Sequence, residues 1–207
     1  MRLEVSELTG ERGGDAVFSG VNFVLDSGAA LLVTGPNGAG KSTLLRVLAG
    51  LLPVASGSID FVGEGEFSRL GAALHYLGHG NSMKTALSVA ENLTFWQSFA
   101  GAPYLGVAEA LDEVGLDGLG HLPFGYLSTG QKRRVAIARL LINYRPVWLL
   151  DEPTAGLDRA SEAHFAALMR AHLEDGGMIV AATHLPLGLD GATTLEMGRP
   201  FSVEQAV

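Results

Sequence analysis

The chain has 207 residues, of which 47% are hydrophobic and 17% are charged, and its formal net charge is −8. This composition is typical of one globular domain and excludes a largely disordered protein. The acidic balance disfavours nucleic acid as a partner, because phosphates require a basic surface. The chain contains no cysteine, which excludes disulfides, zinc–thiolate sites and haem attachment through a C-x-x-C-H motif.

The N-terminal part of the chain predicts β-strands and lacks the apolar stretch of a secretory signal. Apolar and polar residues alternate around Leu3 and again around Phe23, which is typical of antiparallel strands with one solvated face. Residues 29–33 are continuously apolar, as in a central strand covered on both faces. A helix over residues 41–49 follows, with Gly50 well placed to end it. Nowhere does an apolar run approach the roughly 18 residues of a membrane span.

The segment that joins this strand to this helix matches the phosphate-binding pattern G-x-x-x-x-G-K-[ST]. Its glycines let backbone N–H groups surround a phosphate, and the start of the helix adds its positive dipole. Lys41 is expected to reach the β- and γ-phosphates of ATP, and the Ser42 hydroxyl to ligate Mg²⁺. The alternative, a glycine-rich turn before a helix, explains less of the pattern. The expected nucleotide-binding residues are Gly35, Pro36, Asn37, Gly38, Ala39, Gly40, Lys41, Ser42 and Thr43.

The middle of the chain, residues 80–144, has helical character and is expected to form a helical sub-domain. A capping box at residues 88–91 opens the first helix. Two further helices are expected over residues 107–114 and 131–143.

The pattern of strands and helices resumes after this middle part. A strand over residues 147–150, a helix over 159–174 and a strand over 178–182 are expected. We therefore predict an α/β fold of the P-loop NTPase type, a mixed sheet with an antiparallel edge. Its core would consist of residues 1–79 and 145–207, split by the helical sub-domain.

An acidic pair follows the first of these last two strands. Asp151, at the strand end, is expected to hold Mg²⁺ through water. Glu152 would point at the γ-phosphate and polarise the attacking water as a general base. An acidic pair that simply begins a loop is the alternative interpretation. His184 directly follows the last strand, and it is either a structural histidine or a contact of the γ-phosphate.

Residues 127–131, here called the signature segment, read Leu-Ser-Thr-Gly-Gln and lie between the phosphate loop and the acidic pair. These three elements in this order resemble the ATP-binding cassette (ABC) ATPases. The resemblance implies that Ser128 and Gly130 of one subunit contact the γ-phosphate bound by a second copy, and hence a homodimer. It also implies that Asp158 is the D-loop aspartate and that His184 contacts the γ-phosphate.

Three positions depart from the usual pattern of this family. Thr129 replaces a glycine of the signature segment. His79 occupies the place of the Q-loop glutamine, and Gly80 follows where a glutamine is often found. Arg12 stands where an aromatic residue is expected to stack on adenine. A guanidinium plane can stack in the same way, and an exposed loop charge is the equal alternative.

Residues 76–79, followed by Lys84, Thr85 and residues 91–93, resemble the ATP-binding subunits of bacterial haem exporters for cytochrome c maturation. The resemblance spans nearly the whole chain and implies a peripheral ATPase at the cytoplasmic face of the bacterial inner membrane. Its partners would be integral membrane subunits that export haem or release it from a periplasmic chaperone. Three alternatives are the ATPase of another small exporter, a soluble non-transport ABC ATPase and a non-hydrolysing cassette, of which intact Lys41 argues against the last.

Three sets of residues outside these motifs also carry expectations. The cationic residues after the signature segment are expected to form a solvated face: Lys132, Arg133, Arg134 and Arg139. The remaining histidines show no haem-ligand pattern and are expected at the surface or satisfied in the core: His75, His121, His164 and His172. The aromatic-rich residues 79–99 are expected to present an apolar patch to a membrane subunit.

Overall fold

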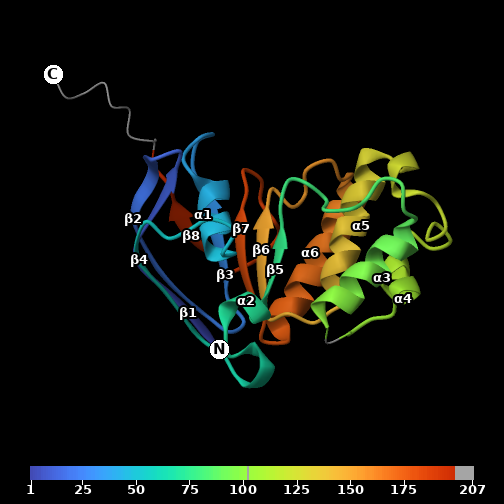
Figure 1. The fold of residues 1–207 in the computed structure, drawn as a ribbon, viewed down its shortest axis with the longest axis horizontal. Helices are drawn as coiled ribbons and strands as arrows, with labels where there is room; N and C mark the ends of the chain where they lie inside the picture. The colour runs from blue at the N-terminus through green and yellow to red at the C-terminus, as the bar shows by residue number, and fades with distance from the viewer. Residues whose placement is uncertain (102, 199–207) are drawn as a thin grey trace.

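The computed structural model describes residues 1–101 and 103–198, and the strands among them form two separate sheets (Figure 1). The first sheet is antiparallel and has the order β2-β1-β4. Its strands are β1 (Arg2–Arg12), β2 (Asp15–Asp26) and β4 (Ser56–Val62). In β1 the alternation of apolar and polar residues puts Leu3 in the core between Leu25 and Phe61 of the neighbouring strands.

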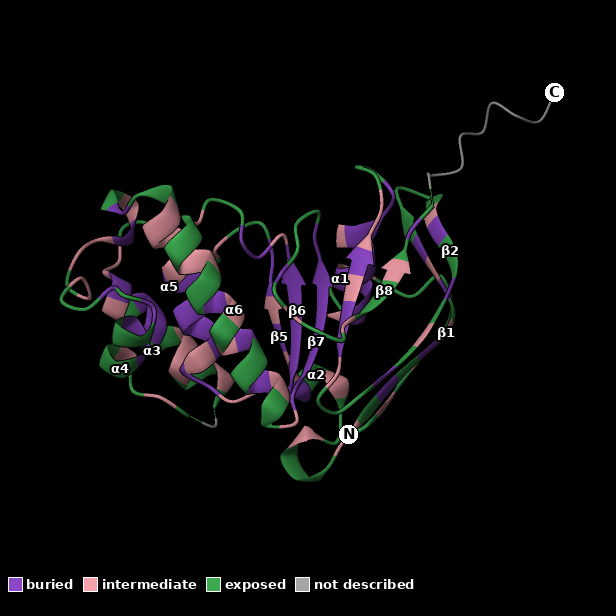
Figure 2. Cartoon of the chain, turned by 180° about the vertical axis from the view of Figure 1, so that it is seen from behind, coloured by how far each residue is buried: buried purple, intermediate pink, exposed green. Residues whose placement is uncertain are grey.

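The second sheet is parallel and has the order β5-β6-β7-β3-β8. Every residue of the neighbouring strands β6 and β7 is buried, as continuous apolar runs predict (Figure 2). The strands of this sheet are β3 (Ala30–Thr34), β5 (Leu74–Leu77), β6 (Val147–Asp151), β7 (Met178–Ala182) and β8 (Thr193–Glu196).

Six α-helices and two short 3₁₀ helices connect the strands in the described residues. Helices α3, α4 and α5 gather at one end of the molecule, beyond the β5 edge of the parallel sheet (Figure 1). The helices are α1 (Lys41–Leu48), α2 (Leu70–Ala73), α3 (Val89–Ala100), α4 (Val107–Glu113), α5 (Thr129–Leu141), α6 (Arg159–Glu174), η1 (Gly65–Phe67) and η2 (Phe124–Tyr126).

Two apolar cores cover the two faces of the parallel sheet. Leu149 of β6 belongs to the core that also contains Leu44 of α1 and Leu3 of β1. The next residue along β6, Leu150, belongs to the core built with Ile137 of α5. Since successive side chains of a strand point to opposite faces, β6 contributes to both cores. Burying one such leucine stabilises the fold by about 1.5–3 kcal/mol.

The structure adds elements that the sequence did not predict. Strands β4, β5 and β8 were not expected. The antiparallel strands, expected at the edge of one mixed sheet, form a sheet of their own because α1 packs between them and the parallel sheet. Helix α5 begins at Thr129, two residues earlier than predicted, because Ser128 is its N-cap. Among the described residues, no helix is both long enough and apolar enough to cross a membrane.

Candidate functional site

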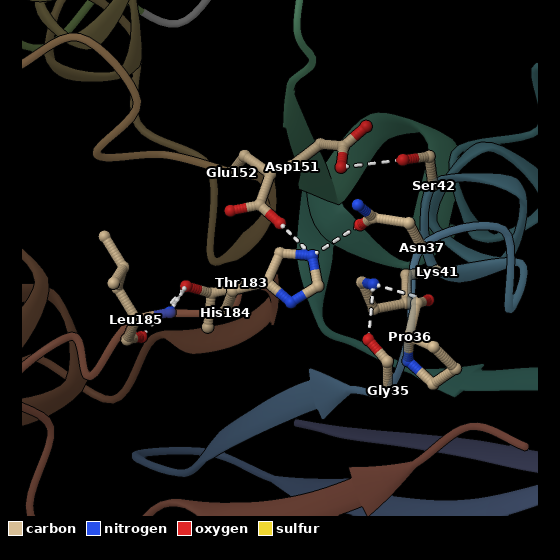
Figure 3. A network of polar contacts seen from close by, with 10 residues as sticks. All are labelled: Gly35, Pro36, Asn37, Lys41, Ser42, Asp151, Glu152, Thr183, His184 and Leu185. Carbon is tan, nitrogen blue, oxygen red and sulfur yellow. Dashed lines mark hydrogen bonds and ion pairs between the residues drawn. The ribbon is translucent and has the colours of Figure 1, made fainter.

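The phosphate loop connects β3 to α1, and its backbone adopts conformations that favour glycine. Gly35 and Gly40 have φ angles of 132° and 96°. A Cβ atom on Gly35 would lie 2.4 Å from the Met197 carbonyl oxygen, so a side chain there would force β8 away. Lys41 lies at the start of α1, and its Nζ donates to the carbonyl oxygens of Gly35 (2.8 Å) and Pro36 (3.1 Å) (Figure 3). The loop therefore curls around the ammonium group.

Ser42 and Asp151 meet beside this loop. The Ser42 hydroxyl donates to Oδ1 of Asp151 at 2.9 Å, although the two residues are far apart in the sequence (Figure 3). Asp151 is the buried last residue of β6, and Ser42 belongs to the first turn of α1. A hydroxyl and a carboxylate are the hard oxygen ligands that suit Mg²⁺, which takes its remaining ligands from water and phosphate oxygens. The donor set therefore fits that ion.

Glu152 follows Asp151 in a left-handed conformation. Its φ of 45° is rare for a residue with a side chain and costs roughly 1–3 kcal/mol, which the surrounding structure must offset. The Glu152 backbone N–H donates to the Ala182 carbonyl oxygen at 2.9 Å. Its side chain, about one third exposed, places Oε1 3.4 Å from Nε2 of His184 (Figure 3). The carboxylate thus faces the centre of the site and remains accessible.

His184 lies on the loop after β7 and joins this loop to the phosphate loop. Its Nε2 lies 2.9 Å from Oδ1 of Asn37, so an Nε2–H tautomer donates to that oxygen. Thr183 fixes the turn that presents the ring, because its Oγ1 accepts from the Leu185 N–H at 3.0 Å (Figure 3). The loops that follow β3, β6 and β7 therefore converge at the carboxyl ends of the parallel strands, which is where open α/β sheets bind ligands.

Five of the side chains just described line a cleft of about 570 Å³, here called the central cleft: Asn37, Lys41, Ser42, Glu152 and His184. Its volume is within the range of small-molecule sites. Arg12, at the end of β1, lines the same cleft as residues of the phosphate loop. Asp15, its partner across the hairpin, also lines the cleft and was not predicted. The lining residues are Arg12, Asp15, Ala16, Val17, Asn37, Gly38, Gly40, Lys41, Ser42, Thr43, Glu152 and His184.

Eight of the expected site residues lie outside the lining of the central cleft. Gly35, Pro36, Ala39 and Asp151 belong to the segments that border it, whereas His79, Ser128, Gly130 and Asp158 come from other parts of the chain. His79 is exposed after β5. The exposed Ser128 caps α5, with its Oγ accepting from the Gln131 N–H at 3.2 Å. The exposed Asp158 caps α6, with Oδ1 accepting from the Ser161 N–H at 2.8 Å. A Cβ atom on Gly130 would lie 3.0 Å from the Gly156 carbonyl oxygen, so the signature segment lies close to the loop before Asp158.

The cationic residues of α5 do not form the solvated face that the sequence predicts. Arg133 and Arg139 are buried, with 4% and 9% of their surface exposed. Arg139 donates to the Tyr76 carbonyl oxygen at 2.6 Å and stacks its guanidinium 4.8 Å from the Trp96 ring centre, and burial lowers its pKa to about 10. Lys132 and Arg134 also donate to backbone carbonyl oxygens. These side chains bind carbonyl groups instead of carboxylates.

A helical pattern in the sequence held the signal for this correction. Arg133 shares a face of α5 with Ile137 and Leu140, at spacings of four and seven residues. That face packs into a core, since both apolar residues are buried. A cation on the apolar stripe of a helix must find partners inside the protein. The expectation of a solvated face was wrong for Arg133 because it considered only the charge of the side chain and not its position on the apolar face of α5.

The remaining histidines agree with the expectation of surface or core positions. Burial lowers the pKa of His75 to about 3, and its Nε2 lies 2.8 Å from the Asn143 carbonyl oxygen. Burial also lowers the pKa of His172 to about 4, and its ring stacks on Trp148 with 4.0 Å between ring centres. His121 and His164 are exposed.

Comparison with known proteins gives consistent matches over most of the chain. A family model described as "ABC transporter" matches residues 18–155. The cytochrome c biogenesis ATP-binding export protein CcmA of Chelativorans sp. (strain BNC1) is 68% identical, over 96% of this chain and 98% of its own length. The structure of cbiO1 from Clostridium perfringens, part of the ABC transporter complex cbiONQ, has a TM-score of 0.74 and 30% identity, covering 97% of this chain and 86% of that one. A putative ABC transporter ATP-binding protein from Pyrococcus furiosus shares the fold alone, with a TM-score of 0.81 at 22% identity over 95% of this chain and 98% of that one.

Proposed function

This chain belongs to the ABC transporter family and is an ABC-type ATPase, and from that premise we propose that it energises haem export, or release of haem from its chaperone, in c-type cytochrome biogenesis. The observation that carries the proposal is 68% identity to a cytochrome c biogenesis ATP-binding export protein along almost the whole chain, together with a central cleft whose side chains suit ATP hydrolysis. The division into a core (residues 1–79 and 145–207) and a helical sub-domain (80–144) forms part of the proposal.

In the proposed reaction the phosphate loop binds the triphosphate of ATP. The backbone N–H groups of the loop and the N-terminus of α1 attract the phosphates, and Lys41 exchanges its two loop carbonyl contacts for β- and γ-phosphate oxygens. Ser42 and Asp151 would hold Mg²⁺, which supplies Lewis-acid stabilisation of the phosphate charge. Arg12 lines the cleft where it can stack on the adenine ring.

Glu152 is the proposed general base and His184 the proposed γ-phosphate contact. The Glu152 carboxylate is accessible and lies beside the His184 ring, so a water between the carboxylate and the γ-phosphate can lose a proton to it. His184 already contacts Asn37 of the phosphate loop, which holds the ring toward the position of the γ-phosphate. His79 is exposed after β5, and we propose that it reaches the nucleotide only when that segment moves.

We propose that a second copy of the chain completes each ATP site. Ser128 and Asp158 are exposed and lie outside the lining of the central cleft of their own chain, which suits groups that act on the nucleotide of a partner. The N-terminus of α5 also presents free N–H groups and a positive dipole beside Ser128, and these favour a phosphate. In a two-fold dimer the same contact forms twice, so both composite sites would be equivalent.

We further propose that integral membrane subunits dock beside helix α3. Phe95 and Phe99 are 53% and 73% exposed and stack on each other, which is unusual for a protein surface that faces only water. Phe99 lines a groove of about 590 Å³ together with Trp96, Arg139 and Arg145, and the lining contains no carboxylate. An apolar helix with polar or acidic ends would fit this groove, and the protein would then lie at the cytoplasmic face of the inner membrane.

Gene deletion with complementation tests the haem assignment. Deleting the gene should abolish holo-cytochrome c, detected by haem staining, and the wild-type chain should restore it. Lys41→Ala should fail to complement although it is produced at normal levels. Normal cytochrome c after deletion would reject the haem assignment and favour the ATPase of another small exporter, while the ABC ATPase itself would stand.

A further inference from the structure

Arg133 lies at the junction of three segments that the proposed reaction uses. It belongs to α5. Strands β5 and β6 pair in parallel, with Leu77 opposite Leu150. The residues that follow this pair, Gly78 and Asp151, therefore lie side by side. The guanidinium contacts the backbone at both strand ends.

The contacts use every part of the guanidinium. Nε donates to the Pro153 carbonyl oxygen at 2.9 Å, and Nη1 donates to that of Gly78 at 2.8 Å. Nη2 donates to the carbonyl oxygens of Asp151 at 3.1 Å and Glu152 at 2.8 Å. Three consecutive carbonyl groups thus converge on one cation. Successive carbonyls of an extended strand point in opposite directions, so the left-handed φ of Glu152 is what turns them the same way.

Because the Arg133 guanidinium is buried, it needs these partners inside the protein. Arg133 is 4% exposed, so its charge depends on the carbonyl oxygens and on the nearby carboxylates of Asp151 and Glu152. Desolvation lowers the pKa of Arg133 and these two carboxylates raise it. Arginine suits such a place because its planar fork carries five donors, whereas lysine offers a single nitrogen.

We propose that Arg133 is a positioning residue for hydrolysis, which holds the backbone of Glu152 in its left-handed conformation and ties the Gly78–His79 turn and the signature helix α5 to it. The inference rests on the proposed role of Glu152. Arg133 does not line the central cleft and contacts the backbone of Glu152, so it acts on the general base through the backbone. It also makes α5, the segment after β5 and the acidic pair shift together, so that movement at one displaces the others.

The test separates turnover from nucleotide binding in the purified full-length chain. Arg133→Gln keeps a polar side chain but leaves most of these carbonyl groups without a partner. Displacing a catalytic base by about 1 Å can lower the rate about 10²-fold. We expect kcat to fall by about 10- to 100-fold, with KM and the Kd of a fluorescent ATP analogue within about threefold of the wild type. Arg133→Lys should lose about 10-fold in kcat, because one ammonium cannot span both strand ends.

Arg134→Gln is the matched control. Arg134 is the next residue of α5, but it donates to the carbonyl oxygens of Val114 and Gly115 at the end of α4. This change should leave kcat and KM near the wild-type values. Thermal unfolding of all three variants reports any general loss of stability.

A double variant tests whether Arg133 acts through Glu152. If it does, adding Arg133→Gln to Glu152→Gln lowers the residual turnover by no more than about twofold, because the general base is already absent. A full additional loss in the double variant, or wild-type kcat in Arg133→Gln, overturns the inference. If Arg133→Gln fails to fold, Arg133→Lys decides, and a normal kcat in that variant also overturns it. Wild-type turnover in Glu152→Gln alone would instead reject the proposed role of Glu152.

Discussion

The central cleft and the signature segment differ in where their polar side chains find partners. In the cleft, residues distant in the sequence contact one another, as Ser42 contacts Asp151 and His184 contacts both Asn37 and Glu152. By contrast, the hydrogen bonds that the described residues make to the side chains of Ser128 and Asp158 come from the starts of their own helices, α5 and α6. The cleft is assembled within one chain, whereas the signature segment presents a capped, exposed helix end. This difference is what we expect if the second region serves another copy.

The largest effect is expected where the cleft holds its general base. Glu152→Gln keeps the size of the side chain and removes the negative charge, so hydrolysis should fall by about 10²–10⁴-fold while ATP still binds. Phosphate release gives the rate, and size-exclusion chromatography with ATP should show an accumulated dimer. Turnover near the wild-type value would remove Glu152 from the mechanism.

Mixing two inactive subunits tests directly whether the signature segment acts on the ATP site of another chain. Ser128→Arg places a bulky cation on the exposed helix end, and Lys41→Ala removes the cation of the phosphate loop. Each homodimer should be inactive. An equal mixture should recover roughly a quarter of the wild-type turnover, because half of the dimers are mixed and one of their two sites is intact. Full activity of either variant alone, or no recovery on mixing, would contradict a shared site.

A third prediction concerns the exposed aromatic surface of α3. Phe95→Asp places a charge on the surface beside the groove, and the loss of an aromatic anchor typically weakens an interface by about 2 kcal/mol or more, a factor of about 30. Co-purification with the membrane subunits and holo-cytochrome c should fall, whereas ATP binding by the isolated chain should not change. Val62→Asp is the matched control, since Val62 is 67% exposed on β4. An equal loss in both variants would place the docking surface elsewhere.

The smallest effect is expected on stability in acid, and it comes from buried histidines that belong to neither the central cleft nor the signature segment. His172 has a pKa of about 4 in the fold against an ordinary value of 6.5, so the unfolded chain binds an extra proton between these values. The free energy of unfolding should therefore fall as the pH drops from about 6.5 towards 4, and His75 should add to the fall.

His172→Phe keeps an aromatic ring to stack on Trp148 and has no proton to gain, so its unfolding free energy should depend less on pH in this range. His121→Gln, at an exposed position, is the control and should leave the slope unchanged. Urea unfolding at several pH values measures both slopes. Parallel slopes for His172→Phe and the wild type would contradict the prediction.

The sequence predicted the elements whose signals are local. Helix α6 and strand β7 have the predicted bounds, because an apolar pattern and a glycine turn mark their ends. Strands β5 and β8 have only four residues each, and β8 is an edge strand with mostly exposed residues, so no periodic pattern could reveal them. Their pairing with β6 and β3 is a tertiary contact.

The same distinction applies to the candidate site. The residues that line the central cleft were predicted largely from motifs, which fix the types and spacing of phosphate-binding groups. Asp15 was missed because only the hairpin register brings it to the cleft. Arg133 was missed because its partners are backbone carbonyls, which are present at every residue and leave no trace in the sequence.

The exposed position of Ser128 has a consequence for gene dosage. If each ATP site needs a signature segment from a second chain, a subunit with a damaged phosphate loop still occupies one half of every dimer it enters. Such a subunit still supplies an intact signature segment to its partner, so activity would fall only in proportion to its share of the subunits, and dilution would switch the enzyme off without any inhibitor. Expression level would then set not only the amount of the machine but also the fraction of it that is assembled.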